Sequence, residues 1–395
     1  MNQPKLLFTI FLSCITTISC AQDSLITNLS KKNLTTFIKQ ADTFTGLGWQ
    51  KIIKKAKTSN DILIGEDHFT NEIPYFTSAI TSKIVFENFI CEIDPFTATI
   101  LQSKIKNLSK DALQNYVDTY GNSFSFYAFS PEFELLKQLT QSNTTILGTD
   151  QILLIGDRVI CNELYQTTRN KTAKEIYKRI AINSKLYFDN FLKDQSKPFY
   201  LLTDDFAKKT DSLSKLPLSK EELKIIDMLK LSAKIYKSQS HELRVQLMKH
   251  QLMELYSKWS GKRNLFKYGA NHLARGEGFL EVYDIGNMVS NLNDANYKSS
   301  LHIMILGISG TQASPFEGFP SEKIDTDSDM LKTLEPIIKT VNGEQWHCFD
   351  LIPLRRELNS GRLNITDIKL QRIIKGYDFL VIIPKVTASK FAKHH

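Results

Sequence analysis

The stretch Asp61-Ile62-Leu63-Ile64-Gly65-Glu66-Asp67-His68 decides the fold class of this sequence. Its apolar run is short and ends at a glycine, which is typical of a buried strand. Gly65 allows the backbone to turn tightly where a side chain would clash. Three ionisable side chains follow at the carboxyl end of the strand, where open α/β sheets collect ligands and reactive groups. The stretch therefore predicts an α/β fold with a site at this strand end.

The same pattern returns in Asn264-Leu265-Phe266-Lys267-Tyr268-Gly269-Ala270-Asn271-His272. Both stretches close a predicted strand with Gly-x-x-His. They are far apart in the chain, so only the fold can bring their histidines together. We expect His68 and His272 to lie in one cleft with Glu66 and Glu92.

Composition narrows the class of protein. The chain has 395 residues, 42% of them hydrophobic, and a formal net charge of +8. This content supports a substantial core. The lysines are dispersed and no recognition motif accompanies them, so the charge indicates a solvated basic surface and not nucleic-acid binding. We expect a small-molecule substrate.

Residues 1–21 have the pattern of an export signal, with Lys5 ahead of an apolar run that is too short to span a bilayer. Ser19-Cys20-Ala21 fits cleavage before Gln22, whereas Thr17-Ile18-Ser19-Cys20 resembles a bacterial lipobox. The second alternative places a lipid on Cys20 and attaches the protein to a membrane. We expect a bacterial protein that is periplasmic, an outer-membrane lipoprotein or secreted.

Three cysteines remain beyond the signal, Cys91, Cys161 and Cys348. They are widely spaced and odd in number, which argues against a disulfide framework. We expect buried structural thiols.

Residues 22–395 are predicted to form a single α/β domain with a mostly parallel central sheet flanked by helices. Residues 152–260 contain helical periodicity and little strand pattern, which predicts a large helical insertion. Residues 27–57 and 276–292 are also predicted to be helical. Strands are expected within the ranges 88–94, 144–151, 300–308, 346–351 and 377–383.

The strand candidate Asn88–Asp94 carries one charge, Glu92, in an apolar run. A buried carboxylate is costly unless it is paired. Glu92 therefore lies either on a solvated edge strand or in the site, where it orients a histidine or binds a metal; we favour the site. The aromatic stretch 120–129 is either a small separate core or the lining of an apolar pocket near the site.

Two chemistries suit these residues. In the first, His68 removes a proton from water, Glu66 or Glu92 orients it, and His272 stabilises the oxyanion without a cofactor. In the second, His68, Glu92 and His272 hold a divalent metal that activates the water. Substrate-binding or supporting roles are expected for six further residues, namely Asp67, Glu72, Asp94, Asp150, Asn271 and Arg275.

The motif series Gly65–His68, Glu92, Gly148-Thr149-Asp150 and Tyr268–His272 resembles that of the erythromycin esterase-like and ChaN-like superfamily. In the esterase branch the first motif's histidine is a general base without an essential metal, which by position is His68. Glu92 and His272 match the residues that support it. The esterases usually carry one more residue between the glutamate and the histidine, where this chain has Asp67 alone.

The resemblance implies an exported hydrolase that cleaves an ester-type bond with histidine-activated water. Two alternatives stay open. One is a ChaN-like lipoprotein that binds haem or iron, and the other is a metal-dependent peptidase of the related Tiki and TraB group of Gly-x-x-His proteins.

Overall fold

The computed structural model describes residues 23–392, and the chain divides into two compact units. Unit 1 contains the residues up to Asp67, Gly269–Thr311 and Lys323–Val386. Unit 2 contains His68–Tyr268, Gln312–Glu322 and the residues from Thr387. The predicted export signal, residues 1–21, lies outside the described residues. Within residues 23–392, no helix has the length and apolar character needed to cross a membrane.

Unit 1 contains strands that follow one another in the order β2-β1-β10-β11-β7-β3. β3, β7 and β11 are parallel and buried along their whole length. Such continuous apolar strands are typical of a parallel sheet that is covered on both faces. β10, β1 and β2 continue the sheet in antiparallel register. The strands are β1 (Leu34–Gln40), β2 (Thr43–Thr45), β3 (Asp61–Glu66), β7 (Ser300–Gly307), β10 (Trp346–Asp350) and β11 (Phe379–Ile383).

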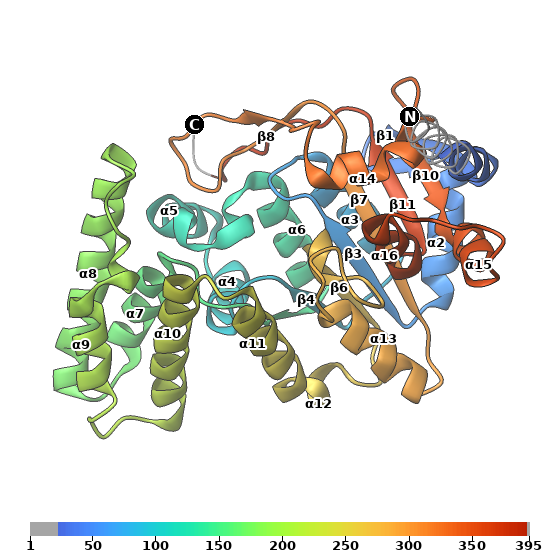
Figure 1. Cartoon of the computed structure of the whole chain (residues 1–395). Helices are drawn as coiled ribbons and strands as arrows, with labels where there is room; N and C mark the ends of the chain where they lie inside the picture. The colour runs from blue at the N-terminus through green and yellow to red at the C-terminus, as the bar shows by residue number, and fades with distance from the viewer. Residues whose placement is uncertain (1–22, 393–395) are drawn as a thin grey trace, which may run out of the picture. The chain divides into compact units, whose positions relative to one another are not determined.

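Helices of unit 1 accompany these strands. α2 packs against β1, and α15 packs against β11 and α16 (Figure 1). Each presents an apolar face to its neighbours, as an amphipathic helix on a sheet must. The helices are α2 (Leu47–Thr58), α13 (Ile285–Ala295), α14 (Asp329–Ile338), α15 (Leu351–Asn359) and α16 (Ile368–Gly376).

Unit 2 contains three parallel strands in the order β6-β4-β5. α4 packs against β5 and α6, and α3 packs against α6. The strands are β4 (Asn88–Cys91), β5 (Thr145–Gly148) and β6 (Asn264–Gly269). The helices are α3 (Glu72–Thr81), α4 (Pro95–Asn107), α5 (Lys110–Tyr120) and α6 (Ser130–Gln141), with the 3-10 turns η1 (Gly121–Ser123) and η2 (Ser125–Ala128).

The helical insertion separates β5 from β6. Figure 1 shows α7, α8, α9 and α10 as neighbouring green and olive helices. The predicted α/β fold, with a mostly parallel sheet flanked by helices and a large helical insertion, is therefore confirmed. The inserted helices are α7 (Gly156–Thr167), α8 (Lys171–Lys193), α9 (Asp204–Leu213), α10 (Lys220–Ser238), α11 (His241–Glu254) and α12 (Tyr256–Trp259).

The helical prediction for residues 27–57 was wrong in its middle. Residues 34–45 form β1 and β2 instead, and Leu34 to Phe37 pair with β10. The segment is rich in threonine and phenylalanine, which suit a pleated and half-buried surface. Its partner strand is more than 300 residues away, so the local helical spacing hid the pairing.

The helix predicted over residues 276–292 begins later, at Ile285. The side chain of Asp284 accepts a hydrogen bond from the Ile285 amide at 2.7 Å and caps the helix. Ahead of it, Gly276 and Gly278 lie in irregular backbone, because glycine makes helix formation less favourable.

All three described cysteines, Cys91, Cys161 and Cys348, are free and buried. Burial raises the pKa of the Cys91 and Cys348 thiols to about 12. They are neutral at physiological pH and act as small apolar side chains.

Asp157 on α7 is fully buried and accepts a hydrogen bond from the Ser184 hydroxyl at 2.6 Å. Burial raises its pKa to about 7 although the Ser184 bond lowers it. The folded chain therefore keeps this proton at pH values where the unfolded chain releases it. Stability falls as pH rises from about 4 to 7, by up to about 1.4 kcal/mol per pH unit.

We expect Asp157→Asn to remove this pH dependence. The unfolding free energy of the variant relative to the wild type should increase between pH 4 and 7 and level off above that range. Urea unfolding followed by circular dichroism at several pH values measures it. A difference that stays constant with pH would contradict the assignment.

Candidate functional site: two histidine and carboxylate pairs

Glu92 follows β4 directly, and its side chain is only 4% exposed. Arg244, on α11, donates from Nη2 to Glu92 Oε1 at 2.6 Å. The same guanidinium donates hydrogen bonds to both carboxylate oxygens of Asp150, which lies just past β5. Nη2 is 2.6 Å from Oδ2 and Nε is 2.9 Å from Oδ1. Arginine suits this task because its planar fork binds carboxylates with fixed geometry. One cation from the insertion thus holds the carboxylates that follow two neighbouring strands.

The charge of Arg244 is secured by these contacts. Burial lowers the arginine pKa, but the carboxylates of Asp150 and Glu92 raise it well above its ordinary value. The two carboxylates are in turn stabilised by a permanent positive charge. Glu92 is therefore a fixed and buried acceptor.

His68 lies against this acceptor. Its Nε2 is 3.5 Å from Glu92 Oε2, and its side chain is 21% exposed. The imidazole also stacks on the Phe126 ring of η2, with centroids 3.8 Å apart and an angle of 13° between the planes. An imidazole held by a carboxylate and still reachable from solvent can exchange a proton with a bound molecule. The aromatic stretch 120–129 thus contributes to the surroundings of His68.

The residue after His68 has an uncommon backbone conformation. Phe69 has a φ of +66°, which side chains other than glycine rarely adopt. Its carbonyl oxygen accepts hydrogen bonds from the amides of Ala313 and Ser389, each at 3.0 Å. Such conformations persist where the surrounding structure enforces them and are concentrated at functional sites.

The second Gly-x-x-His motif, in unit 1, also pairs its histidine with a carboxylate. His272 Nδ1 lies 2.7 Å from Asp284 Oδ2, and the two side chains are 6% and 2% exposed. Asp284 caps α13 through its other oxygen, so its position is fixed. The carboxylate favours the form of His272 that carries a proton on Nδ1.

Three of the predicted supporting residues have structural partners within their own units. Asp94 caps α4 by accepting from the amides of Phe96 and Thr97, and burial raises its pKa to about 6. Glu72 binds the hydroxyl of Thr387 at 2.7 Å. Arg275 donates to Asp378 and to the Ser300 carbonyl.

The remaining predicted residues sit at strand ends or turns. Glu66 ends β3 and is 4% exposed, and Asp67 donates its amide to the Ile305 carbonyl at 3.3 Å. Asn271 lies in the 3-10 turn η4 (Ala270–His272) after β6. Gly65 allows a close approach of the backbone here, because an added Cβ would lie 3.0 Å from Ala270 Cα.

Arg275 belongs to a buried ionic cluster in unit 1. The Asp378 carboxylate accepts hydrogen bonds from Arg275, from Arg355 Nη2 at 2.8 Å and from the His302 amide at 3.0 Å. Burial alone would raise the Asp378 pKa, but Arg275 and Arg355 help to hold it at about 2. Burial and Arg275 together lower the pKa of His302 to about 3, so that histidine is neutral at physiological pH.

Sequence reasoning missed two residues that contact the predicted histidines or their carboxylate, namely Arg244 and Asp284, and included Phe126 only as part of the aromatic stretch 120–129. Only Asp284 carried a local signal, because an aspartate just before an apolar helical run is a common cap. Within residues 23–392, no group of three or more His, Cys, Asp and Glu side chains has the arrangement of a metal site.

Comparison with known proteins identifies the fold. No protein-family profile and no curated protein matches the sequence. Among solved structures, one described as a succinoglycan biosynthesis protein has a TM-score of 0.55 at 13% identity and covers 94% of this chain and 99% of its own. A protein from Bacillus cereus has a TM-score of 0.53 at 14% identity, covering 94% and 99%.

A histidine-to-asparagine mutant of the erythromycin esterase EreC, in its open conformation, has a TM-score of 0.56 at 13% identity. It covers 91% of this chain and all of its own. These likenesses show that the chain has the fold of the erythromycin esterase-like proteins. The resemblance stated from the motifs is thus confirmed at the level of the fold.

Proposed function

We propose that this chain is an exported hydrolase that cleaves an ester-type bond with water activated by His68. The observation that carries the proposal is the placement of His68 Nε2 3.5 Å from the buried Glu92 carboxylate, with the imidazole still 21% exposed. A general base needs a partner that stabilises its protonated form and an open side toward substrate. Catalytic hydrogen bonds are often long without substrate and tighten on binding.

The roles of the surrounding residues follow from their contacts. Glu92 orients His68 and stabilises the imidazolium that forms when water loses its proton. Arg244 holds the Glu92 carboxylate in place, and Asp150 fixes the position of the guanidinium.

The experiment is a hydrolysis assay of the purified mature chain with p-nitrophenyl acetate, butyrate and octanoate. Turnover is measured before and after chelation, together with metal and haem content. We expect turnover that survives chelation. Activity lost on chelation would favour the metal-dependent alternative, and bound haem without turnover would favour the haem-binding one; either result overturns the proposal.

Arg244→Lys tests whether the carboxylate clamp supports catalysis. Lysine keeps the charge but cannot bind Glu92 and Asp150 with the same planar fork, so Glu92 should shift. A misplacement of about 1 Å costs roughly 10²-fold, and we expect a loss of this order in kcat with little change in KM. Arg362→Lys, which alters an exposed pair with Glu357, is the matched control and should leave kcat unchanged. Equal effects of the two variants would contradict the role given to Arg244.

A further inference from the structure

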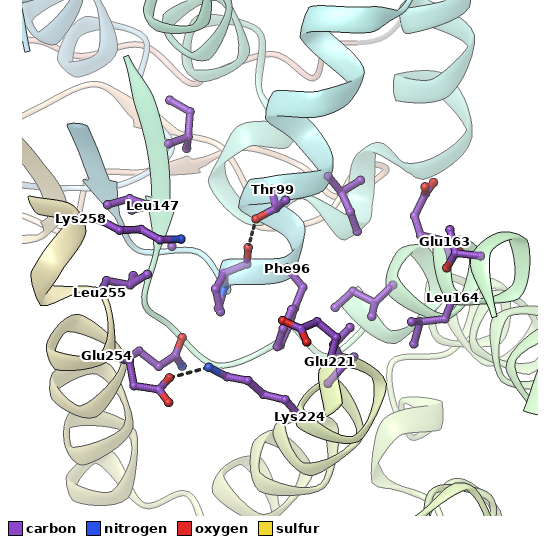
Figure 2. Close-up of a pocket in the computed structure, with 18 residues that line it drawn as sticks. Phe96, Thr99, Leu147, Glu163, Leu164, Glu221, Lys224, Glu254, Leu255 and Lys258 are labelled. Carbon is purple, nitrogen blue, oxygen red and sulfur yellow. Dashed lines mark hydrogen bonds and ion pairs between the residues drawn. The ribbon is translucent and has the colours of Figure 1, made fainter. Parts of the chain in front are cut away.

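Unit 2 contains a pocket of about 520 Å³ that is lined by α4, β5, α7, α10 and α11. Figure 2 shows Phe96, Leu147, Leu164 and Leu255 around it. Neither His68 nor Glu92 lines this pocket, so it is a feature separate from the histidine pair. Its size is within the range of small-molecule sites.

The wall of the pocket is mainly aliphatic. Phe96, Ile100, Ile225 and Leu255 are only half-buried, although they are large apolar side chains. Phe96 and Ile100 lie on α4, Ile225 lies on α10 and Leu255 follows α11, and all four border the same pocket. The lining is completed by buried aliphatic residues of β5 and α7, Leu147 and Ile160. Such a wall offers one aromatic ring for stacking and many methyl groups for burial. Burial of this apolar surface is therefore most favourable under a flexible aliphatic chain.

The rim carries charges of both signs. Lys224 and Glu254 form an ion pair at 2.8 Å, which Figure 2 shows as a dashed line. Glu163, which lines the pocket, forms an ion pair at 2.9 Å with Lys104, which does not line it. Glu221 and Lys258 add one further charge of each sign. An anionic head group would face the glutamates and a cationic one the lysines, so neither is favoured over an uncharged head.

We propose that this pocket binds the aliphatic chain of a molecule with an uncharged polar head, such as a long-chain alcohol. The chain covers the half-buried side chains of α4, α10 and α11. The hydroxyl stays at the polar rim, where paired charges can accept or donate a hydrogen bond. The proposal does not depend on hydrolysis at His68.

The test is isothermal titration calorimetry of the whole mature chain with the linear alcohols from 1-butanol to 1-octanol. Each added methylene should tighten binding by about three- to fourfold until the pocket is full. Octanoate and octylamine should bind more weakly than 1-octanol. His68→Ala should bind 1-octanol as the wild type does, which separates this pocket from the proposed catalytic site.

Ile225→Asp places a charge in the apolar wall and should weaken 1-octanol binding at least about tenfold. Ile182→Asp is the control, because Ile182 is an exposed isoleucine on α8, 56% accessible and outside the pocket. Ile225→Trp fills the space and gives a second variant if the aspartate prevents folding. Affinity independent of chain length, binding unchanged in the Ile225 variants, or octanoate bound as tightly as octanol would each overturn the proposal.

Discussion

Replacing His68 with alanine is expected to lower kcat/KM for ester hydrolysis by about 10²- to 10⁴-fold, the usual contribution of a general base. Without the imidazole, no base lies between the Glu92 carboxylate and solvent to accept a proton from water. The measurement is the initial rate with p-nitrophenyl butyrate over a range of concentrations. His250→Ala is the matched control, because His250 lies on α11 with a side chain that is 72% exposed.

We expect the His250 variant to retain wild-type rates. The unfolding midpoints of both variants should be measured alongside, since a rate lost through unfolding would mislead. If well-folded His68→Ala keeps more than about a tenth of the wild-type rate, His68 is not the general base.

The second large effect is expected on stability. Lys267 of β6 and Glu132 of α6 form an ion pair at 2.6 Å, with side chains only 2% and 7% exposed. Lys267→Met leaves the Glu132 carboxylate in a buried site without its cation. Removing one partner of a buried pair typically costs about 3–5 kcal/mol, and we expect a loss of this size in unfolding free energy. Urea unfolding at neutral pH measures it.

Replacing both partners, in Lys267→Met with Glu132→Leu, should recover most of this loss, because no buried charge then remains unpaired. Lys137→Met is the exposed control; it removes a pair with Glu134 on the surface and should change stability by less than about 1 kcal/mol. A double variant as unstable as Lys267→Met alone would show that packing, rather than the uncompensated charge, sets the cost.

The parallel strands could be predicted from sequence because burial on both faces leaves continuous apolar runs. Ile62 to Ile64 and Phe379 to Ile383 are such runs, and each forms a strand. β1 could not, because only Phe37 along it is buried and its register depends on the distant β10. Local spacing carries no information on a partner of that kind.

The pairing of His68 with Glu92 was within reach of sequence reasoning for a physical reason. A carboxylate in an apolar strand needs a partner, and this requirement favoured a place for Glu92 in the site. The role of Arg244 could not be predicted from the sequence. Arg244 lies 152 positions beyond Glu92, in a helix whose charged residues have the pattern of an ordinary solvated face. The stacking of His68 on Phe126 depends on a 3-10 turn whose direction the sequence does not specify.

A double-mutant cycle on His68 and Glu92, measured as kcat/KM with p-nitrophenyl butyrate, tests most directly whether Glu92 acts through His68. We expect His68→Ala combined with Glu92→Gln to be no slower than His68→Ala alone, because Glu92 acts only through the imidazole. Rate losses that multiply in the double variant would contradict it, since the two side chains would then act independently.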